Sequence, residues 1–292
     1  MKIIDAFVYY NEDDLAEARL RYYADTVDAF IITESDLTWN TQPNKQKFLN
    51  QVWPRLPQNI KDKIHYKFVE HPQEWANNRK RWKYPETETK NAMAFIAKEN
   101  YDPDDLFLFS DIDEFWDIRK LDEMKQTAKD RYWFTCINIF YVCHVYWWSG
   151  YGDEKWFGTR GTQIKRLIHE SPLLNEILSF KKSKNVTMHP EERQLTLLPY
   201  NGWHFSKFGT VDERSSKFDS LVETRHWPEK AGKSMHEIAQ AGTTLSDWNR
   251  SVGKKKLNGK QLTLQQAKEK LDPKLFDILK EYKTFWSGAY EV

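Results

Sequence analysis

Short runs of strand-forming apolar residues recur along the first part of the chain, and stretches with helical spacing separate them. The strands that these runs predict cover 3–10, 29–33, 65–69 and 106–109. Between them, apolar side chains recur every three or four residues over 15–22 and 92–96, which is the period of a helix. Strands that alternate with helices are typical of α/β proteins, so we predict a mostly parallel sheet flanked by helices.

Aromatic strands and then helices follow after residue 130. The strands expected there cover 133–146, 163–167 and 195–198. A capping box over 210–213 opens a helix, and Thr263 and Asp272 begin two more. We therefore predict one α/β domain over 1–227 and a helical C-terminal extension over 228–292 that packs on it.

Polar residues follow three of the predicted strands. Asn11, Glu34 and Asp111 stand where an apolar run gives way to polar residues. In open α/β sheets, ligands bind outside the carboxyl ends of the strands. We therefore expect these three residues on the ligand-binding edge of the sheet.

The stretch "DDLFLFSDIDEFWD" ends an apolar strand in carboxylates. Asp111 and Asp113 are two residues apart where the strand gives way to a loop, so both can face one cation, unless the turn is merely solvated. Mn²⁺ and Mg²⁺ prefer carboxylate oxygens, and Mg²⁺ commonly shares its shell with substrate phosphates. A diphosphate bound to such an ion is a better leaving group, because the ion takes up the developing charge.

The same Asp-x-Asp pattern occurs in phosphatases that use an aspartyl nucleophile. Those enzymes carry the motif on the first strand, with Thr or Val two residues beyond the second Asp. Here the motif lies more than a hundred residues into the chain, and Phe115 occupies that position. Both differences count against a phosphatase.

The stretch "NGWHFSKFGTVDERSSKF" supplies further candidates. His204 lies in a predicted Gly-Trp-His turn, from which its imidazole would reach the open side of the metal. Lys207 would meet a phosphate. A lone histidine is more often a hydrogen-bonded core residue, and that alternative stays open.

Charge and cysteine content narrow the classes of function. Lys and Arg number 44 against 43 Asp and Glu, a net charge of +1, so no global field favours nucleic acid. Cys136 and Cys143 lie in an apolar stretch without a Cys-x-x-Cys motif, and we expect two reduced core thiols. No leader precedes the first strand, and no window approaches the ~20 apolar residues of a membrane span. We therefore expect a soluble, cytoplasmic protein.

Taken together, these motifs resemble glycosyltransferase family 17, which includes the enzyme that adds the bisecting N-acetylglucosamine to N-glycans. The resemblance runs through "IIDAFVYYNEDDLAEARLRYYADTVDAFIITESDLTW", "FSDIDE" and "NGWHFSKFG", in that order. Glu34, the acidic stretch 111–114 and the Gly-Trp-His of 202–204 stand at the family's motifs. The resemblance implies a GT-A fold, a nucleotide-sugar donor that is usually UDP-linked, a divalent metal and inversion at the anomeric carbon.

The chain departs from the family's pattern at two places. The family's Glu-x-x-Gln-Arg-Asn reads "ETETKN" here, which keeps a cation as Lys90 but lacks the Gln. Phe115 and Trp116 stand where small apolar and proline residues are common. Lys90 and Lys207 fall within matched motifs, so we expect both to contact the donor diphosphate.

An inverting transferase needs a base to take the proton of the acceptor hydroxyl, normally Asp or Glu. The loop "WWSGYGDEKWFGTR" offers Asp153 and Glu154 beside tryptophans, on which apolar sugar faces stack. The acceptor-site candidates are Trp147, Trp148 and Trp156. An aromatic core strand with a charged turn explains the loop equally well, and Glu170 and Glu176 are also possible bases.

We predict a metal-dependent hexosyl- or N-acetylhexosaminyltransferase that moves a sugar from a UDP-sugar to a hydroxyl of a glycan acceptor, with inversion. The predicted donor site comprises Asn11, Glu34, Lys90, Asp111 and Lys207. The predicted ligands of Mn²⁺ or Mg²⁺ are Asp111, Asp113 and His204. An Asp-x-Asp phosphatase and a non-catalytic carbohydrate-binding protein are the alternatives.

Overall fold

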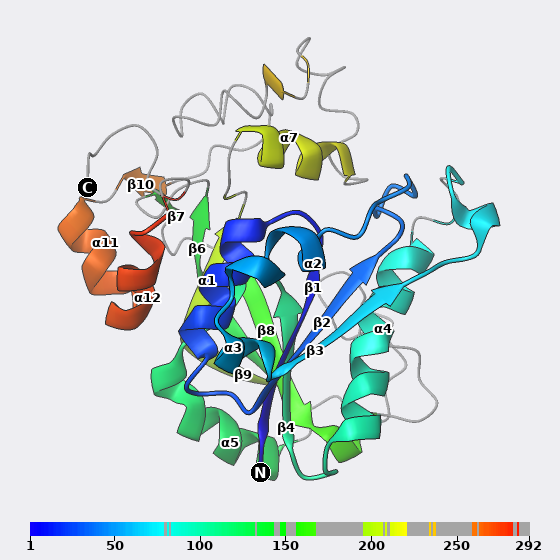
Figure 1. Ribbon diagram of the computed structural model, residues 1–292. Coiled ribbons are helices and arrows are strands. Elements are labelled where there is room, and N and C mark those ends of the chain that lie inside the picture. Colours follow the sequence, from blue (N-terminus) through cyan, green and yellow to red (C-terminus); the bar gives the residue numbers. More distant parts are fainter. Residues whose placement is uncertain are drawn as a thin grey trace.

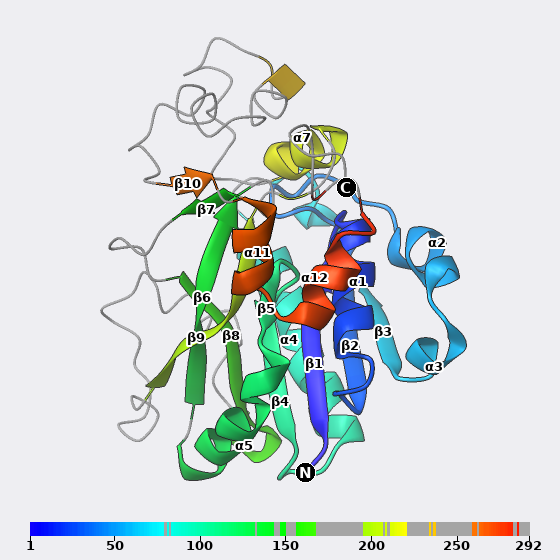
Figure 2. The same cartoon turned by 90° about the vertical axis from the view of Figure 1, so that its left-hand side faces the viewer.

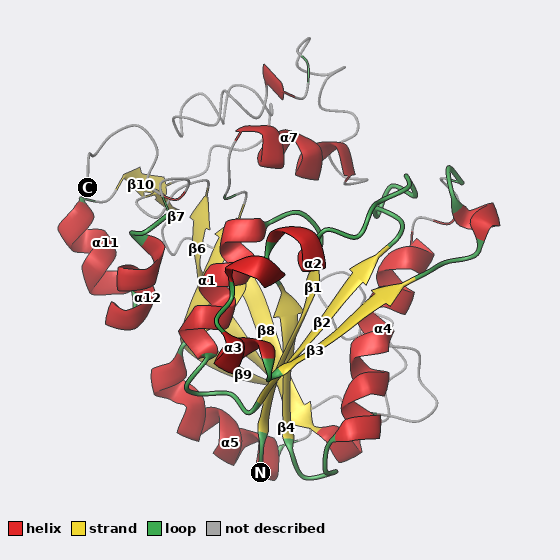
Figure 3. Cartoon of the chain, in the orientation of Figure 1, coloured by secondary structure: helices red, strands yellow, loops and turns green. Residues whose placement is uncertain are grey.

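The structure is a computed structural model with a twisted sheet at its centre and helices on both faces (Figures 1 and 3). It describes residues 1–78, 81, 83–131, 133–142, 147–149, 156–167, 195–206, 208, 211–220, 234, 236–237, 259–261, 263–282 and 285. The α/β class with flanking helices, expected from the sequence, is confirmed.

Four neighbouring strands form the parallel half of the sheet. They are β1 (Ile3–Tyr9), β2 (Ala29–Ser35), β3 (Ile64–Val69) and β4 (Leu106–Asp111), in the order β4-β1-β2-β3. β1 and β2 are buried along their whole length, because helices cover both faces. The register aligns Val8 with Asp111 and Tyr9 with Glu34, so the carboxyl ends of these strands meet at one edge.

The other half of the sheet is largely antiparallel. Its strands are β5 (Glu114–Trp116), β6 (Trp133–Val142), β7 (Trp147–Ser149), β8 (Trp156–Gln163), β9 (Leu195–Ser206) and β10 (Gly259–Gln261). β6 and β9 run parallel, whereas the other described pairings of this half, and that of β8 with β4, are antiparallel. The expected mostly parallel sheet is thus corrected to a mixed one. No helix is described between β6, β7 and β8, and parallel neighbours need a long crossover, usually helical.

Helices cover the two faces of the parallel half differently. On one face lies α4 (Lys83–Asn100), whose Met93 and Ala97 pack with Phe107 and Phe109 of β4. The other face of the whole sheet carries α1 (Asp13–Tyr23), α2 (Phe48–Gln51), α3 (Gln58–Lys61), α5 (Leu121–Asp130), α11 (Leu264–Lys270) and α12 (Pro273–Leu279) (Figure 2), and of these α5 contacts β6 and β8 of the antiparallel half. α7 (Val211–Ser220) lies across the carboxyl ends of the strands (Figure 1). Short 3-10 helices are η1 (Trp53–Arg55), η2 (Gln73–Trp75), η4 (Ile118–Lys120) and η5 (Ile164–Arg166).

Two of the predicted helix starts are confirmed in their hydrogen bonds. The Thr263 side chain accepts from the Gln266 backbone, and the Gln266 side chain accepts from the Thr263 backbone, which is a capping box. Asp272 caps α12 by accepting from two backbone N–H groups, with Pro273 in the first turn. α7 begins at Val211, but the predicted cap at Thr210 lies outside the described residues.

Two local predictions are wrong. The strand expected over 163–167 ends at Gln163, and η5 follows. The expected Gly-Trp-His turn lies inside β9, a strand of 12 residues. Position 202 of this strand needs a glycine, because a Cβ atom there would lie 2.1 Å from the backbone oxygen of Phe115 on β5.

The C-terminal helices share the main core with the N-terminal part. Leu275 and Leu279 are fully buried in the same cluster as Leu15 and Leu20 of α1. The described part of the predicted extension therefore packs on the α/β domain, while the boundary at residue 227 stays a prediction. Cys136 is a buried free thiol, and Cys143 lies outside the described residues. Among the described residues, no helix is long and apolar enough to cross a membrane.

Candidate active site

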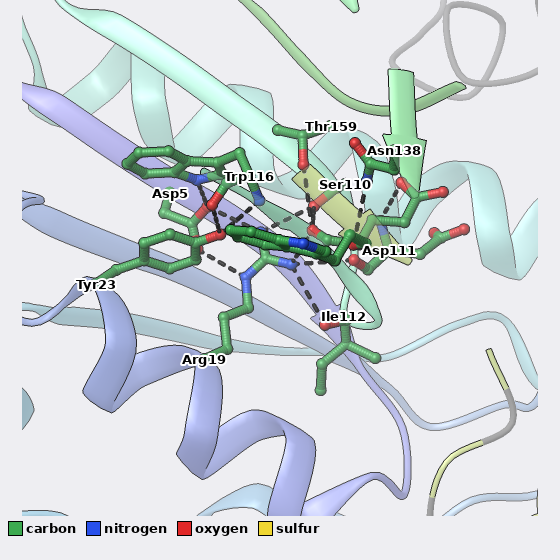
Figure 4. Close-up of polar contacts among 11 residues, drawn as sticks. Asp5, Arg19, Tyr23, Ser110, Asp111, Ile112, Trp116, Asn138 and Thr159 are labelled. Carbon is green, nitrogen blue, oxygen red and sulfur yellow. Dashed lines mark hydrogen bonds and ion pairs between the residues drawn. The ribbon is translucent and has the colours of Figure 1, made fainter. Parts of the chain in front are cut away.

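A fully buried arginine on α1 organises the Asp-x-Asp turn (Figure 4). The Arg19 guanidinium donates to the backbone oxygens of three residues, and these are Asp111 at 3.1 Å, Ile112 at 3.3 Å and Glu114 at 2.9 Å. It also donates to both carboxylate oxygens of Asp5, each at 2.8 Å. Because one planar group binds three carbonyls, the turn after β4 is held in one shape.

The aromatic residues after the acidic turn fix it from the other side. The Trp116 backbone N–H donates to the Tyr23 hydroxyl at 2.6 Å, and that hydroxyl donates to the Trp116 carbonyl at 2.9 Å. The two rings stack at 4.3 Å, and the Trp116 indole donates to Asp5 at 3.0 Å. Phe115 and Trp116 are fully buried. Core packing therefore accounts for Phe115 and Trp116, which stand where small apolar and proline residues are common in the family.

The stretch that follows Asp-x-Asp and the Gly-Trp-His stretch are hydrogen-bonded to each other. β5 pairs antiparallel with β9, and the register aligns Glu114 with His204 and Trp116 with Gly202. The Phe205 backbone N–H also donates to the Asp113 carbonyl at 2.7 Å. The pairing of these strands thereby carries His204 to the Asp-x-Asp turn, over a separation of about ninety residues.

Asp113 stands between two basic side chains. Its Oδ1 lies 3.4 Å from the His204 Nε2, and its Oδ2 accepts from the Lys217 ammonium at 3.0 Å. Lys217, from α7, also pairs with Glu12 at 2.7 Å. Burial raises the pKa of Asp113, but Lys217 and His204 lower it further, so the pKa lies below its usual range. Asp113 is therefore a carboxylate at neutral pH.

Asp111 has a more open setting. Its side chain is 51% exposed, and its carboxylate lies 3.1 Å from the Lys90 ammonium. Lys90 is buried and also pairs with Glu86, one turn earlier on α4, at 2.8 Å. Burial lowers the pKa of Lys90, but Asp111 and Glu86 raise it further, so the lysine stays charged. The matched cation of the "ETETKN" motif thus lies at the acidic turn.

The three predicted metal ligands fit a divalent ion to different degrees. Asp113 and His204 lie close enough for one ion to bind both. Asp111 is on the same turn but is engaged by Lys90, and no group of three or more His, Cys, Asp or Glu residues is poised for a metal among the residues that the structure describes. Carboxylates suit Mn²⁺ and Mg²⁺, and an imidazole ligand favours the transition metal of the two. Asp113 and His204 are therefore compatible with Mn²⁺ as two of its ligands, and metal binding itself remains a prediction.

The two other predicted donor-site residues lie on the same edge with different roles. The buried Glu34 carboxylate accepts from the backbone N–H groups of Lys47 and Phe48, at 2.7 and 3.2 Å, and from the Tyr66 hydroxyl at 2.7 Å. Burial raises its pKa, and these hydrogen bonds offset the effect in part. Glu34 thus holds the start of α2, whereas Asn11 accepts from the Lys47 ammonium at 3.0 Å.

A pocket opens beside these residues. Its lining residues are Tyr9, Tyr10, Glu12, Ser35, Leu37, Trp39 and Lys217. It is partly open to solvent. Three aromatic rings on its wall make it suited to a flat, partly apolar molecule, and the Lys217 ammonium on the same wall is paired with Glu12.

Several predicted residues lie outside the described part of the chain. These are the candidate bases Asp153, Glu154, Glu170 and Glu176, and the candidate phosphate contact Lys207. For the acceptor-site candidates Trp147, Trp148 and Trp156 the structure describes only the backbone, in β7 and β8. All of these remain predictions.

Three residues that the sequence analysis did not single out belong to the site. Arg19 sits on the apolar face of α1, where an arginine among core positions was the available signal. Glu12 follows the first strand directly and shares the signal that identified Asn11. Lys217 gave no local signal, since it is one of several charged residues on α7.

Comparison with known proteins gives one family match. The model described as Glycosyltransferase family 17 matches residues 1–131, which confirms the resemblance over that segment. The matched segment includes the Asp-x-Asp turn, and His204 and Lys217 lie outside it. No curated protein sequence matches the chain.

Similar solved structures are distant. Rv0371c from Mycobacterium tuberculosis H37Rv has 10% identity and a TM-score of 0.37, over 69% of this chain and 89% of that one. The galactosyltransferase LgtC, in complex with donor and acceptor sugar analogues, has 14% identity and a TM-score of 0.37, over 68% and 73%. S. aureus TarS 1–349 has 11% identity and a TM-score of 0.38, over 86% and 81%.

Proposed function

We propose that this chain, whose residues 1–131 match glycosyltransferase family 17, transfers a hexosyl or N-acetylhexosaminyl group from a UDP-sugar to a hydroxyl of a glycan acceptor. The reaction depends on a divalent metal and inverts the anomeric centre. One observation carries the proposal: the Asp113 carboxylate and the His204 imidazole converge at the carboxyl end of β4, beside a pocket lined with aromatic rings.

Asp113 and His204 would hold the metal, with Asp111 as a third ligand once it leaves Lys90. When bound, the ion stabilises the negative charge that develops on the departing diphosphate. Lys90 lies close enough to add positive charge at the same place. Lys207 would do the same from the segment after β9.

The pocket suits the nucleoside part of the donor. Tyr10 and Trp39 offer ring faces for the base, and the Lys47 ammonium lies 5.1 Å from the centre of the Tyr10 ring. Glu34 acts indirectly, since it fixes the start of α2 through two backbone N–H groups. Asn11 would orient Lys47 toward the donor.

The acceptor needs a base and a surface for its sugar rings. Asp153 or Glu154 would take the proton of the attacking hydroxyl, which then displaces the diphosphate from the opposite face of the donor sugar. Trp147, Trp148 and Trp156 would stack on the acceptor. Because attack comes from the face opposite the leaving group, the product has the inverted configuration.

A panel of nucleotide sugars tests the proposal. Each is incubated with the protein and Mn²⁺, with and without EDTA, and released nucleotide is measured; p-nitrophenyl phosphate and a glycan array are run in parallel. We expect slow release of UDP from one UDP-sugar, which EDTA abolishes. Phosphate release from the monoester would instead identify a phosphatase, and glycan binding without UDP release would identify a carbohydrate-binding protein.

Matched aspartates control for nonspecific effects in this assay. Asp113→Asn should abolish UDP release. Asp104→Asn should leave it unchanged, because that side chain is 71% exposed and pairs with Lys165 on the opposite edge of the sheet.

A further inference from the structure

Lys217 is a partly buried cation shared by two carboxylates from different parts of the chain. Its ammonium lies 2.7 Å from Glu12, which follows β1, and 3.0 Å from Asp113, which follows β4. The Lys217 side chain is 18% exposed, and those of Glu12 and Asp113 are 7% and 9% exposed. Charges buried to this extent are costly unless they are paired, so the lysine compensates both acids.

The two oxygens of Asp113 face different neighbours. His204 lies at Oδ1, and Lys217 lies at Oδ2. A divalent ion bound to Asp113 and His204 would therefore sit within a few ångströms of the ammonium. Two cations at that distance repel each other strongly in a poorly hydrated site.

We propose that Lys217 is an internal counter-ion that competes with the divalent cation for Asp113. In the metal-free protein its ammonium neutralises Asp113. When the ion binds, the ammonium leaves Asp113 and stays on Glu12. Lys217, which lines the pocket, then faces the donor diphosphate. This second part rests on the proposed function.

Glu12 explains why the lysine remains at the site after this exchange. Of the two ion pairs that Lys217 makes, the one with Glu12 is the shorter, and Glu12 also lines the pocket. A lysine that only fastened α7 to the sheet would show no competition with metal. Metal affinity therefore separates the two roles.

Titration with Mn²⁺ alone tests the competition, because free Mn²⁺ is followed by its electron paramagnetic resonance signal. Lys217→Met keeps the length of the side chain and removes the charge. We expect Mn²⁺ to bind this variant about tenfold more tightly than wild type. We also expect a lower Tm without metal and a larger rise in Tm when Mn²⁺ is added.

Lys274→Met is the matched control, because that lysine makes an exposed ion pair with Asp25 and should leave Mn²⁺ affinity unchanged. Equal or weaker Mn²⁺ binding by Lys217→Met would overturn the inference. If this variant does not fold, Glu12→Gln/Lys217→Met, which removes opposite charges together, is compared with Glu12→Gln. Tighter Mn²⁺ binding by the double variant supports the competition, and equal binding overturns it.

A UDP titration at saturating Mn²⁺ tests the second part. Lys217→Met should bind UDP about tenfold more weakly than wild type, although it binds Mn²⁺ more tightly. Unchanged UDP affinity would show that Lys217 does not contact the diphosphate, and the proposed competition between Lys217 and the metal for Asp113 would still hold. Failure of wild type to bind UDP would count against the proposed function, which the Mn²⁺ titration alone does not measure.

Discussion

Asp113 combines deep burial with a stable negative charge. The pKa of its carboxyl lies below the usual range, because Lys217 and His204 outweigh the effect of burial. The charged Asp113 carboxylate lies 3.4 Å from the His204 imidazole. Asp111, half exposed on the same turn, has no such enclosure.

Replacing Asp113 with Asn should therefore weaken binding of UDP with Mn²⁺ by at least about tenfold, or about 1.4 kcal/mol. The amide keeps the shape but loses the charge, while Lys217 keeps Glu12 as a partner, so the variant should fold. Calorimetry with UDP, with and without Mn²⁺, measures the effect. Wild-type affinity in the variant would show that the metal binds elsewhere.

The candidate base calls for a separate prediction, because Asp153 and Glu154 lie outside the described residues. Asp153→Asn or Glu154→Gln keeps the size of the side chain and removes the proton acceptor. Loss of a general base lowers the transfer rate by ~10²–10⁴, whereas UDP affinity should stay the same.

Transfer rate and UDP affinity are measured on the same preparation of each variant. If both variants transfer sugar at the wild-type rate, neither residue is the base, and Glu170 and Glu176 become the candidates. Parallel losses of rate and UDP affinity would place the loop in the donor site instead.

At the scale of elements, α1 acts as the support of the acidic turn. Arg19 crosses from the helix to three backbone carbonyls after β4, and Asp5 on β1 neutralises it inside the core. The site therefore depends on contacts among β1, α1 and the end of β4 that involve no side chain of a proposed metal ligand. Figure 4 shows the guanidinium at the centre of this network.

Arg19→Met should lower the free energy of unfolding by about 3–5 kcal/mol, because the buried Asp5 carboxylate would lose the cation that balances its charge. Urea denaturation followed by circular dichroism measures the loss. Adding Asp5→Asn should restore part of it, since the unpaired charge is removed. Arg55→Met, at an arginine whose side chain is 36% exposed, should cost less than about 1 kcal/mol. An equal cost for both arginines would refute the special role of Arg19.

At the scale of the whole molecule, the C-terminal helices pack into the same core as the N-terminal helix α1. α12 packs against α1, and the Trp203 indole of β9 donates to the Lys270 carbonyl at the end of α11. The Arg21 guanidinium on α1 also pairs with Glu281 beyond α12. We therefore expect the N-terminal domain and the C-terminal helices to unfold together.

Leu279→Ala should lower the free energy of unfolding by about 2–5 kcal/mol, because the side chain is fully buried in the main core. A single transition should shift as a whole when it is followed by tryptophan fluorescence and by circular dichroism. Lys280→Ala, at an exposed position beside it, should leave the transition in place. Two transitions, with only one of them shifted, would show that the C-terminal helices form an independent unit.

Much of the parallel half was predictable because its signals are local. The apolar runs of β1 to β4 and the helical spacing of α1 and α4 are readable within a window of about ten residues. The caps at Thr263 and Asp272 are local as well, since each binds backbone N–H groups within three residues. Asn11, Glu34 and Asp111 at one edge followed from the same reasoning.

The direction of the remaining strands and the setting of the site were decided by tertiary structure. Gly-Trp-His looks like a turn in isolation, yet close contact between Gly202 and Phe115 makes it part of β9. The pairing of Lys217 with Glu12 and Asp113 joins charges some hundred and two hundred residues apart, and no local pattern reports such a pair. Local sequence patterns therefore suffice to show which residue types stand at the strand ends. The fold decided which of them meet, because burial leaves a charge stable only where the packed chain supplies its partner.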